Sequence, residues 1–111
     1  MEYAVHVTKK AEQDLVEAID YIDHVLRNPQ AADRLLDSAE EEIGKLAFMP
    51  KKHKLADDSV LASWGIRFIA VGGYLAFYIV DDDREVVHIV RFLHGRRNWA
   101  SLLNSGPVSF L

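Results

Sequence analysis

Positively charged side chains at the end of one apolar segment are the residues of this chain best suited to chemistry. The segment of residues 85–93 runs directly into the sequence H-G-R-R, which begins at His94, and Arg67 lies near the start of an earlier apolar segment. Guanidinium groups held on a rigid strand end can bind phosphate or carboxylate through paired hydrogen bonds. A histidine beside them can move a proton. The residues that could form such an anion site are Arg67, His94, Arg96 and Arg97.

Arg91 lies inside the same segment and raises a separate question. With a strand period of two, it shares a face with the apolar Val87, Ile89 and Leu93, whereas Phe92 and His94 belong to the other face. A guanidinium among apolar neighbours needs a partner, because burying an unpaired charge is costly. That partner is either a carboxylate on a neighbouring element or a ligand.

Nothing in the sequence indicates a metal or a cofactor. The chain has no cysteine, and its five histidines, at positions 6, 24, 53, 88 and 94, show no ligand spacing. Gly72-Gly73 predicts a turn and not a phosphate-binding loop, since no lysine or helix follows in the required pattern. We therefore expect neither a metal site nor a bound cofactor.

The second half of the chain predicts a three-stranded meander. Apolar runs cover about residues 66–71, 74–80 and 85–93, and the turn signals Gly72-Gly73 and Asp81-Asp82-Asp83 separate them. The second hairpin runs back along the first, so we expect the His94 end of the last strand to approach Arg67. A short helix is expected over residues 98–104.

The first half predicts one strand and two helices. Residues 3–7 alternate as a strand does, and Thr8 is a good helix N-cap. Apolar residues then recur at helical spacing over about residues 9–27. Asn28-Pro29 ends this helix and starts a second one, which stops before Pro50. We expect residues 51–63 to form a loop.

These elements predict a single α+β domain over residues 1–111. The link at Asn28-Pro29 is so short that the two helices must fold back as an antiparallel hairpin. This hairpin should cover one face of a mainly antiparallel four-stranded sheet. The other face of the sheet should be partly open. The larger apolar side chains expected to be mostly buried are Leu15, Ile19, Ile22, Leu36, Ile43, Phe68, Phe77 and Ile89.

The composition fits a cytoplasmic protein. The 111 residues carry a net charge of −4, half of them are apolar, and no apolar run approaches the ~20 residues of a membrane helix. We expect no secretion signal, no disulfide and no membrane partner. Residues 1–50 contain eleven acidic and five basic side chains, whereas residues 51–111 contain six and eight. An acidic helical half is most simply a solvated surface.

Several short segments, in order and nearly end to end, resemble the RelE/ParE superfamily of toxins from bacterial type II toxin–antitoxin modules. The first half contributes T-x-x-A-E-x-D-L from Thr8, D-Y-I from Asp20, N-P-x-A-A from Asn28 and L-A-F-M-P from Leu46. The second half contributes G-I-R from Gly65, G-Y-L-A-F-Y from Gly73 and V-x-I-V-R-F-L-H-G-R-R-N-W from Val87.

This resemblance implies a growth-inhibitory toxin that a cognate antitoxin neutralises and that serves in plasmid stabilisation. In the RelE branch the toxin enters the ribosome and cuts mRNA without a metal. In the ParE branch it poisons DNA gyrase and is not an enzyme. If the chain were a nuclease, the resemblance and the residue types would make Arg67, His94 and Arg97 catalytic. The residues we expect to contact a target are Arg91, Arg96 and Trp99.

Two departures favour the ParE branch slightly. After the glycine–tyrosine turn the nuclease branch usually has an arginine, and this chain has Leu75. Ribosome-bound nucleases are also generally basic, because they bind phosphate, whereas this chain is acidic. The RelE-like mRNA endoribonuclease stays open as an alternative, as does a degenerate domain that only binds an antitoxin.

Overall fold

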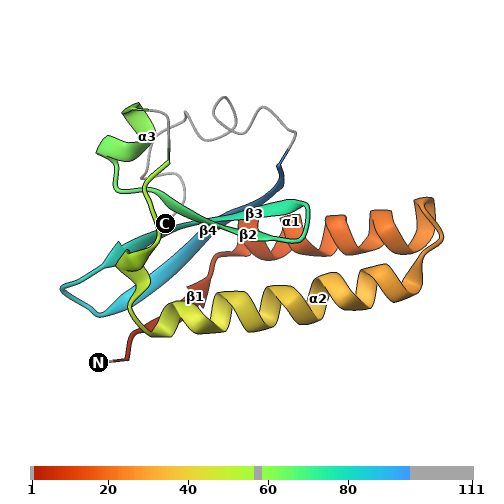
Figure 1. Cartoon of the computed structure of the whole chain (residues 1–111), viewed down its shortest axis with the longest axis horizontal. Helices are drawn as coiled ribbons and strands as arrows, with labels where there is room; N and C mark the ends of the chain where they lie inside the picture. The colour runs from red at the N-terminus through yellow and green to blue at the C-terminus, as the bar shows by residue number, and fades with distance from the viewer. Residues whose placement is uncertain (1, 57–58, 96–111) are drawn as a thin grey trace.

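The computed structural model describes residues 2–56 and 59–95, with two long helices beside a sheet (Figure 1). The predicted helix over residues 98–104 and the candidate residues Arg96, Arg97 and Trp99 lie outside the described residues. The elements in chain order are β1 (Ala4–Val7), α1 (Lys9–Asp20), a π-helical turn (Tyr21–Val25), α2 (Pro29–Gly44), two 3-10 turns (Lys45–Ala47 and Pro50–Lys52), α3 (Ser59–Ser63), β2 (Arg67–Val71), β3 (Tyr74–Asp81) and β4 (Val86–His94).

The four strands form one sheet in the order β1-β4-β3-β2. The strands β2, β3 and β4 pair antiparallel as the predicted meander, and β1 adds to β4 in parallel. The predicted α+β fold, with a mainly antiparallel four-stranded sheet, is confirmed. The helices begin where their capping residues predict, since Thr8 accepts a hydrogen bond from the N–H of Ala11 and Asn28 accepts one from that of Ala31.

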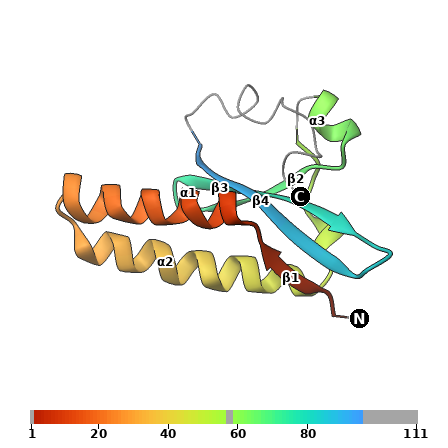
Figure 2. The same cartoon turned by 180° about the vertical axis from the view of Figure 1, so that it is seen from behind.

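The helical hairpin covers one face of the sheet, and α3 lies on the other side (Figures 1 and 2). The hairpin makes most of its deepest contacts through small residues: four of its five buried apolar positions are alanines, Ala11, Ala18, Ala32 and Ala39, and the fifth is Leu35. The larger residues of the same stripes, Leu15, Ile19, Ile22, Leu36 and Ile43, keep part of their surface exposed. The hairpin therefore lies close to the sheet. We call its four buried alanines the alanine floor and the five larger, partly exposed residues the rim.

The opposite face of the sheet is less open than the sequence suggested. A second core packs there around Phe77, Val90 and Leu93, and Leu61 of α3 and Ile66 complete it. All five side chains are buried. Residues 51–63, expected to be a loop, contain a 3-10 turn and α3 instead. These elements bring apolar residues over the face that we predicted to be partly open.

A β-bulge in β4 overturns the predicted alternation of that strand. Phe77 pairs with Arg91 and Tyr78 pairs with Ile89, which leaves Val90 as an extra residue. An extra residue shifts every later side chain to the opposite face. Phe92 therefore joins Ile89 in the core under the helices, whereas Leu93 joins Val90 in the second core.

Candidate functional site

Arg91, just after the bulge, is paired with Asp14 of α1. Its Nε donates to Oδ2 of Asp14 at 2.7 Å, and its Nη2 donates to Oδ1 at 3.1 Å. The backbone N–H of Phe92 donates to the same carboxylate at 3.0 Å. Asp14 and Arg91 are only 7% and 8% exposed. This two-pronged contact is the geometry in which arginine binds carboxylate most strongly.

The carboxylate of Asp14 accepts a hydrogen bond from the edge of β4 beyond the end of β1. The parallel strand β1 ends at Val7, opposite Ile89, so Phe92 lies beyond the last residue of β4 that pairs with β1. Thr8 makes the preceding contact, because its Oγ1 donates to the carbonyl of Ile89 at 2.8 Å. Side chains from the start of α1 thus continue, along the edge of β4, the hydrogen bonding that β1 begins.

The sequence left a carboxylate or a ligand as the partner of Arg91, and in the structure the partner is a carboxylate. The guanidinium has little free surface and two of its nitrogens are already engaged. We therefore assign Arg91 to the link between α1 and β4. This burial argues against its predicted contact with a target.

Arg67 and His94 lie far apart, so the predicted approach of these two residues is wrong. Arg67 pairs with Tyr78, whereas His94 pairs with Tyr74, four positions away along β3. That separation is about 13 Å along the strand, and β3 stands between them. In a meander the third strand ends level with the first turn, which is the end of β2 opposite to Arg67. The Nη1 of Arg67 instead donates to the carbonyl of His53 at 2.6 Å.

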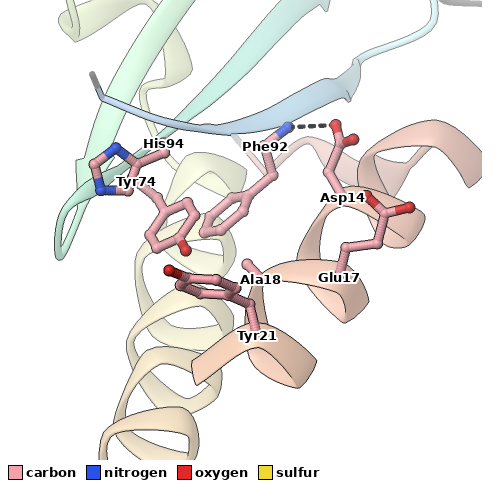
Figure 3. Close-up of a pocket in the computed structure, with 7 residues that line it drawn as sticks. All are labelled: Asp14, Glu17, Ala18, Tyr21, Tyr74, Phe92 and His94. Carbon is pink, nitrogen blue, oxygen red and sulfur yellow. Dashed lines mark hydrogen bonds between the residues drawn. The ribbon is translucent and has the colours of Figure 1, made fainter. Parts of the chain in front are cut away.

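His94 lies next to Gly73 of the β2–β3 turn. It also lines a pocket between α1 and the sheet (Figure 3). Its ring meets that of Tyr74 edge to face at 5.1 Å, and Tyr74 stacks on Phe92 at 5.2 Å. The N–H of Gly95 donates to the carbonyl of Gly73 at 2.9 Å, which holds the end of β4 against the turn. His94 is thus part of an aromatic cluster at this end of the sheet.

The pocket has a volume of about 390 Å³. Its described lining consists of Asp14, Glu17, Ala18, Tyr21, Tyr74, Phe92 and His94. Burial raises the pKa of the Tyr74 hydroxyl, and the nearby Tyr21 adds a smaller effect in the same direction. Sequence reasoning found only His94 of this set. The one available signal was the T-x-x-A-E-x-D-L segment, whose aspartate is Asp14.

A second, smaller hollow lies between the two helices and the sheet. Its volume is about 120 Å³, and its lining is apolar apart from Glu40. The hairpin and its π-helical turn also expose apolar side chains, since Val16, Tyr21, Val25 and Leu26 are each more than half exposed. Such a surface is typical of a face that binds another protein.

A basic cluster lies at the other end of the molecule, in the segment after α2. Lys51 forms an ion pair with Asp82, which also accepts a hydrogen bond from the Tyr3 hydroxyl at 2.8 Å. These two contacts lower the pKa of the Asp82 carboxyl. Burial lowers the pKa of His53 in the same segment. The acidic turn between β3 and β4 therefore neutralises part of this basic cluster.

Two kinds of feature are missing from residues 2–56 and 59–95, a cluster of metal ligands and a membrane-spanning helix. No three histidine, aspartate or glutamate side chains in this part lie close enough together to share a metal ion. None of its helices combines the length and the apolar character needed to cross a bilayer.

Comparison with known structures identifies the same fold in two toxin–antitoxin systems. The chromosomal ParDE toxin–antitoxin system from P. aeruginosa contains a chain similar to this one, with a TM-score of 0.68 and 20% identity over 84% of this chain and 96% of that one. The toxin–antitoxin complex RelBE2 from Mycobacterium tuberculosis contains another, with a TM-score of 0.58 and 23% identity over 85% and 99%. At these identities the similarity establishes the fold alone.

The sequence itself identifies the family. No curated protein sequence matches the chain. The model of the family described as the ParE toxin of type II toxin–antitoxin system, parDE, matches residues 5–99, which cover all the strands and helices described above except Ala4, the first residue of β1. The chain therefore belongs to the ParE toxin family, within the RelE/ParE superfamily that its sequence resembles.

Proposed function

We propose that this toxin inhibits growth by binding DNA gyrase, is neutralised by a cognate antitoxin in the cytoplasm, and does not cut RNA. The observation that carries the choice of mechanism is the position of the candidate cations among the described residues. Cleavage of RNA without a metal needs several charged groups around one phosphate, together with a group that moves a proton. Arg67 and His94 are separated along the sheet, and Arg91 is held by Asp14.

Leu75 supports the same choice. It occupies the position at which the nuclease branch usually carries an arginine, and here its side chain packs against the second core. A leucine in that core offers a phosphate no hydrogen bond. The family match and the acidic composition of the chain point in the same direction.

The exposed apolar surface of the helical hairpin supports an antitoxin partner. The rim of bulky residues and the hollow beside Leu15 and Ile43 suit a segment that folds as it binds. A short reading frame adjacent to the toxin gene, with a DNA-binding start and a disordered end, would encode it.

The mechanism is tested by inducing the full chain without its antitoxin and pulse-labelling DNA and protein synthesis. We expect growth arrest, early loss of DNA synthesis and gyrase-linked DNA breaks, with protein synthesis continuing. Co-expression of the adjacent frame should relieve the arrest. In vitro, the chain should inhibit supercoiling by purified gyrase.

Three results would overturn the proposal. Protein synthesis that stops within minutes, with mRNA cut at codon positions and the effect lost in Arg97→Ala, would establish the nuclease. Unimpaired growth on verified soluble expression would favour a degenerate, antitoxin-binding domain. Growth arrest that the adjacent frame does not relieve would overturn the proposed neutralisation by a partner encoded there.

A further inference from the structure

The pocket beside His94 has aromatic walls and acidic side chains at its edge, and we call it the tyrosine pocket. Figure 3 shows the rings of Tyr21, Tyr74 and Phe92 gathered around it, with Ala18 between them and the carboxylates of Asp14 and Glu17 on one side. The small side chain of Ala18 leaves the space that the aromatic rings surround. The pocket is open to solvent, and about half of Tyr21 is exposed.

Two features of the main chain shape this pocket. Tyr21 begins the π-helical turn that follows α1, in which the N–H of Leu26 donates to the carbonyl of Tyr21. Single π turns of this kind occur often at functional sites. On the sheet side, the bulge in β4 turns Phe92 toward the helices, where Tyr74 stacks on it. The register shift and the π turn therefore aim aromatic rings into the same space.

One acidic side chain of the tyrosine pocket is unpaired within the part of the chain that the structure describes. Asp14 is neutralised by Arg91, but Glu17 has no cationic partner among the described residues. The described lining contains no lysine and no arginine. Aromatic faces attract cations, and the Tyr21 and Tyr74 hydroxyl oxygens can accept hydrogen bonds. A ligand for this pocket should therefore be a flat cation with several N–H donors.

We propose that the tyrosine pocket receives an arginine side chain of the antitoxin. A guanidinium matches the pocket better than an ammonium because it is planar, stacks on aromatic rings and donates in a fork toward a carboxylate. In this arrangement the guanidinium lies against the aromatic rings and forms an ion pair with Glu17 at the edge of the pocket. The inference rests on the proposed antitoxin partner and adds the chemical group by which that partner is anchored.

The first test needs neither toxicity nor an antitoxin. The full chain is titrated with Nα-acetyl-arginine amide, and binding is followed through the backbone amide NMR signals of Ala18, Tyr21 and Tyr74. We expect saturable shifts with a dissociation constant on the order of millimolar. Nα-acetyl-citrulline amide, which has the same shape and no charge, should give no saturable shifts. The lysine derivative should bind more weakly than the arginine derivative.

Two variants and one control locate the binding. Glu17→Gln and Tyr21→Leu alter exposed lining residues and should each weaken arginine binding roughly three- to tenfold. Glu12→Gln removes an exposed acid of the same helix outside the pocket and should leave it unchanged. Equal binding of citrulline and arginine, or equal loss in Glu12→Gln and Glu17→Gln, would overturn the proposal, as would no binding at all.

A second test connects the pocket with the antitoxin. Each arginine of the co-expressed antitoxin is replaced in turn by alanine, and its affinity for wild-type toxin and for Tyr21→Leu is measured. One replacement should weaken binding to wild-type toxin at least tenfold and have much less effect on Tyr21→Leu. If every replacement acts equally on both toxins, the antitoxin does not use this pocket. A failure of growth arrest would instead count against the proposed function and leave the arginine titration standing.

Discussion

Asp14 and Arg91 stand 77 positions apart in the chain, and their side chains meet in a buried, two-pronged ion pair. The same carboxylate accepts the N–H of Phe92, so three hydrogen bonds converge on one residue of α1. This contact fixes α1 against β4 where β1 no longer reaches. It also sets the position of Phe92, which forms part of the tyrosine pocket.

The first prediction follows from that contact. Asp14→Ala leaves a buried guanidinium and a backbone N–H without their acceptor, so it should lower the free energy of unfolding by about 3–5 kcal/mol. Urea unfolding measures the loss. Asp20→Asn, an exposed acid of the same helix, is the control and should change stability by less than about 0.5 kcal/mol. A loss below about 1 kcal/mol in Asp14→Ala would show that water replaces the carboxylate there.

The second prediction concerns Thr8, which caps α1 and also donates to the carbonyl of Ile89. Thr8→Val keeps the shape and removes both contacts, so it should cost about 1–3 kcal/mol. Thr8→Ser keeps the hydroxyl and should recover most of that loss. If the serine and valine variants unfold at the same urea concentration, the hydroxyl contributes nothing.

A third prediction separates the floor of the hairpin from its rim. Leu35 is 7% exposed and packs in the core, whereas its neighbour Leu36 keeps more of its surface. Leu35→Ala should therefore cost about 2–5 kcal/mol, and Leu36→Ala less than half as much. The two proteins are compared by urea unfolding under the same conditions. The reverse order would mean that the helix is rotated from the orientation described.

The fourth prediction is a dependence on alkaline pH. Burial raises the pKa of Tyr78 to about 12, and its hydroxyl donates to the carbonyl of Pro50 at 2.6 Å. Because the unfolded pKa is near 10, the stability that the neutral hydroxyl provides is complete below pH 10 and is lost as the pH rises to about 12. Tyr78→Phe should be less stable than wild type at pH 8, and the difference should shrink between pH 10 and 12.

Thermal unfolding of both proteins from pH 8 to 12 provides this measurement. Lysines and the other tyrosines titrate in both proteins, so only the difference between them reports on Tyr78. A difference that stays constant over the range would show that Tyr78 titrates alike in the folded and unfolded chains.

Much of the fold could be predicted from the sequence because its signals are local. Thr8, Asn28 and the Gly72-Gly73 turn mark element boundaries within one or two residues, and hydrophobic periodicity identifies the helices and strands between them. The bulge was not predictable in this way. No glycine or proline near Val90 and Arg91 marks an extra residue. The residues on either side alternate as in a regular strand, so the sequence gives no sign of the bulge.

The candidate site was predicted less well, for two different reasons. The predicted approach of Arg67 and His94 was an error of strand direction. The predicted meander already implied that the end of β4 lies at the opposite end of the sheet from the start of β2, where Arg67 lies. Asp14 could not be found in that way, because one aspartate on an acidic helix looks like any solvated residue until the helix is packed. Tyr21 and Tyr74 are 53 positions apart, and only the folded chain brings their side chains into one pocket.

The alanine floor of the hairpin has a consequence for how such toxins can diversify. A larger side chain at Ala11, Ala18, Ala32 or Ala39 would push a helix away from the sheet, so these positions tolerate little change. The rim residues, Leu36 among them, keep part of their surface exposed and so tolerate more change. The outer surface of the hairpin can therefore change its side chains while the framework beneath stays the same.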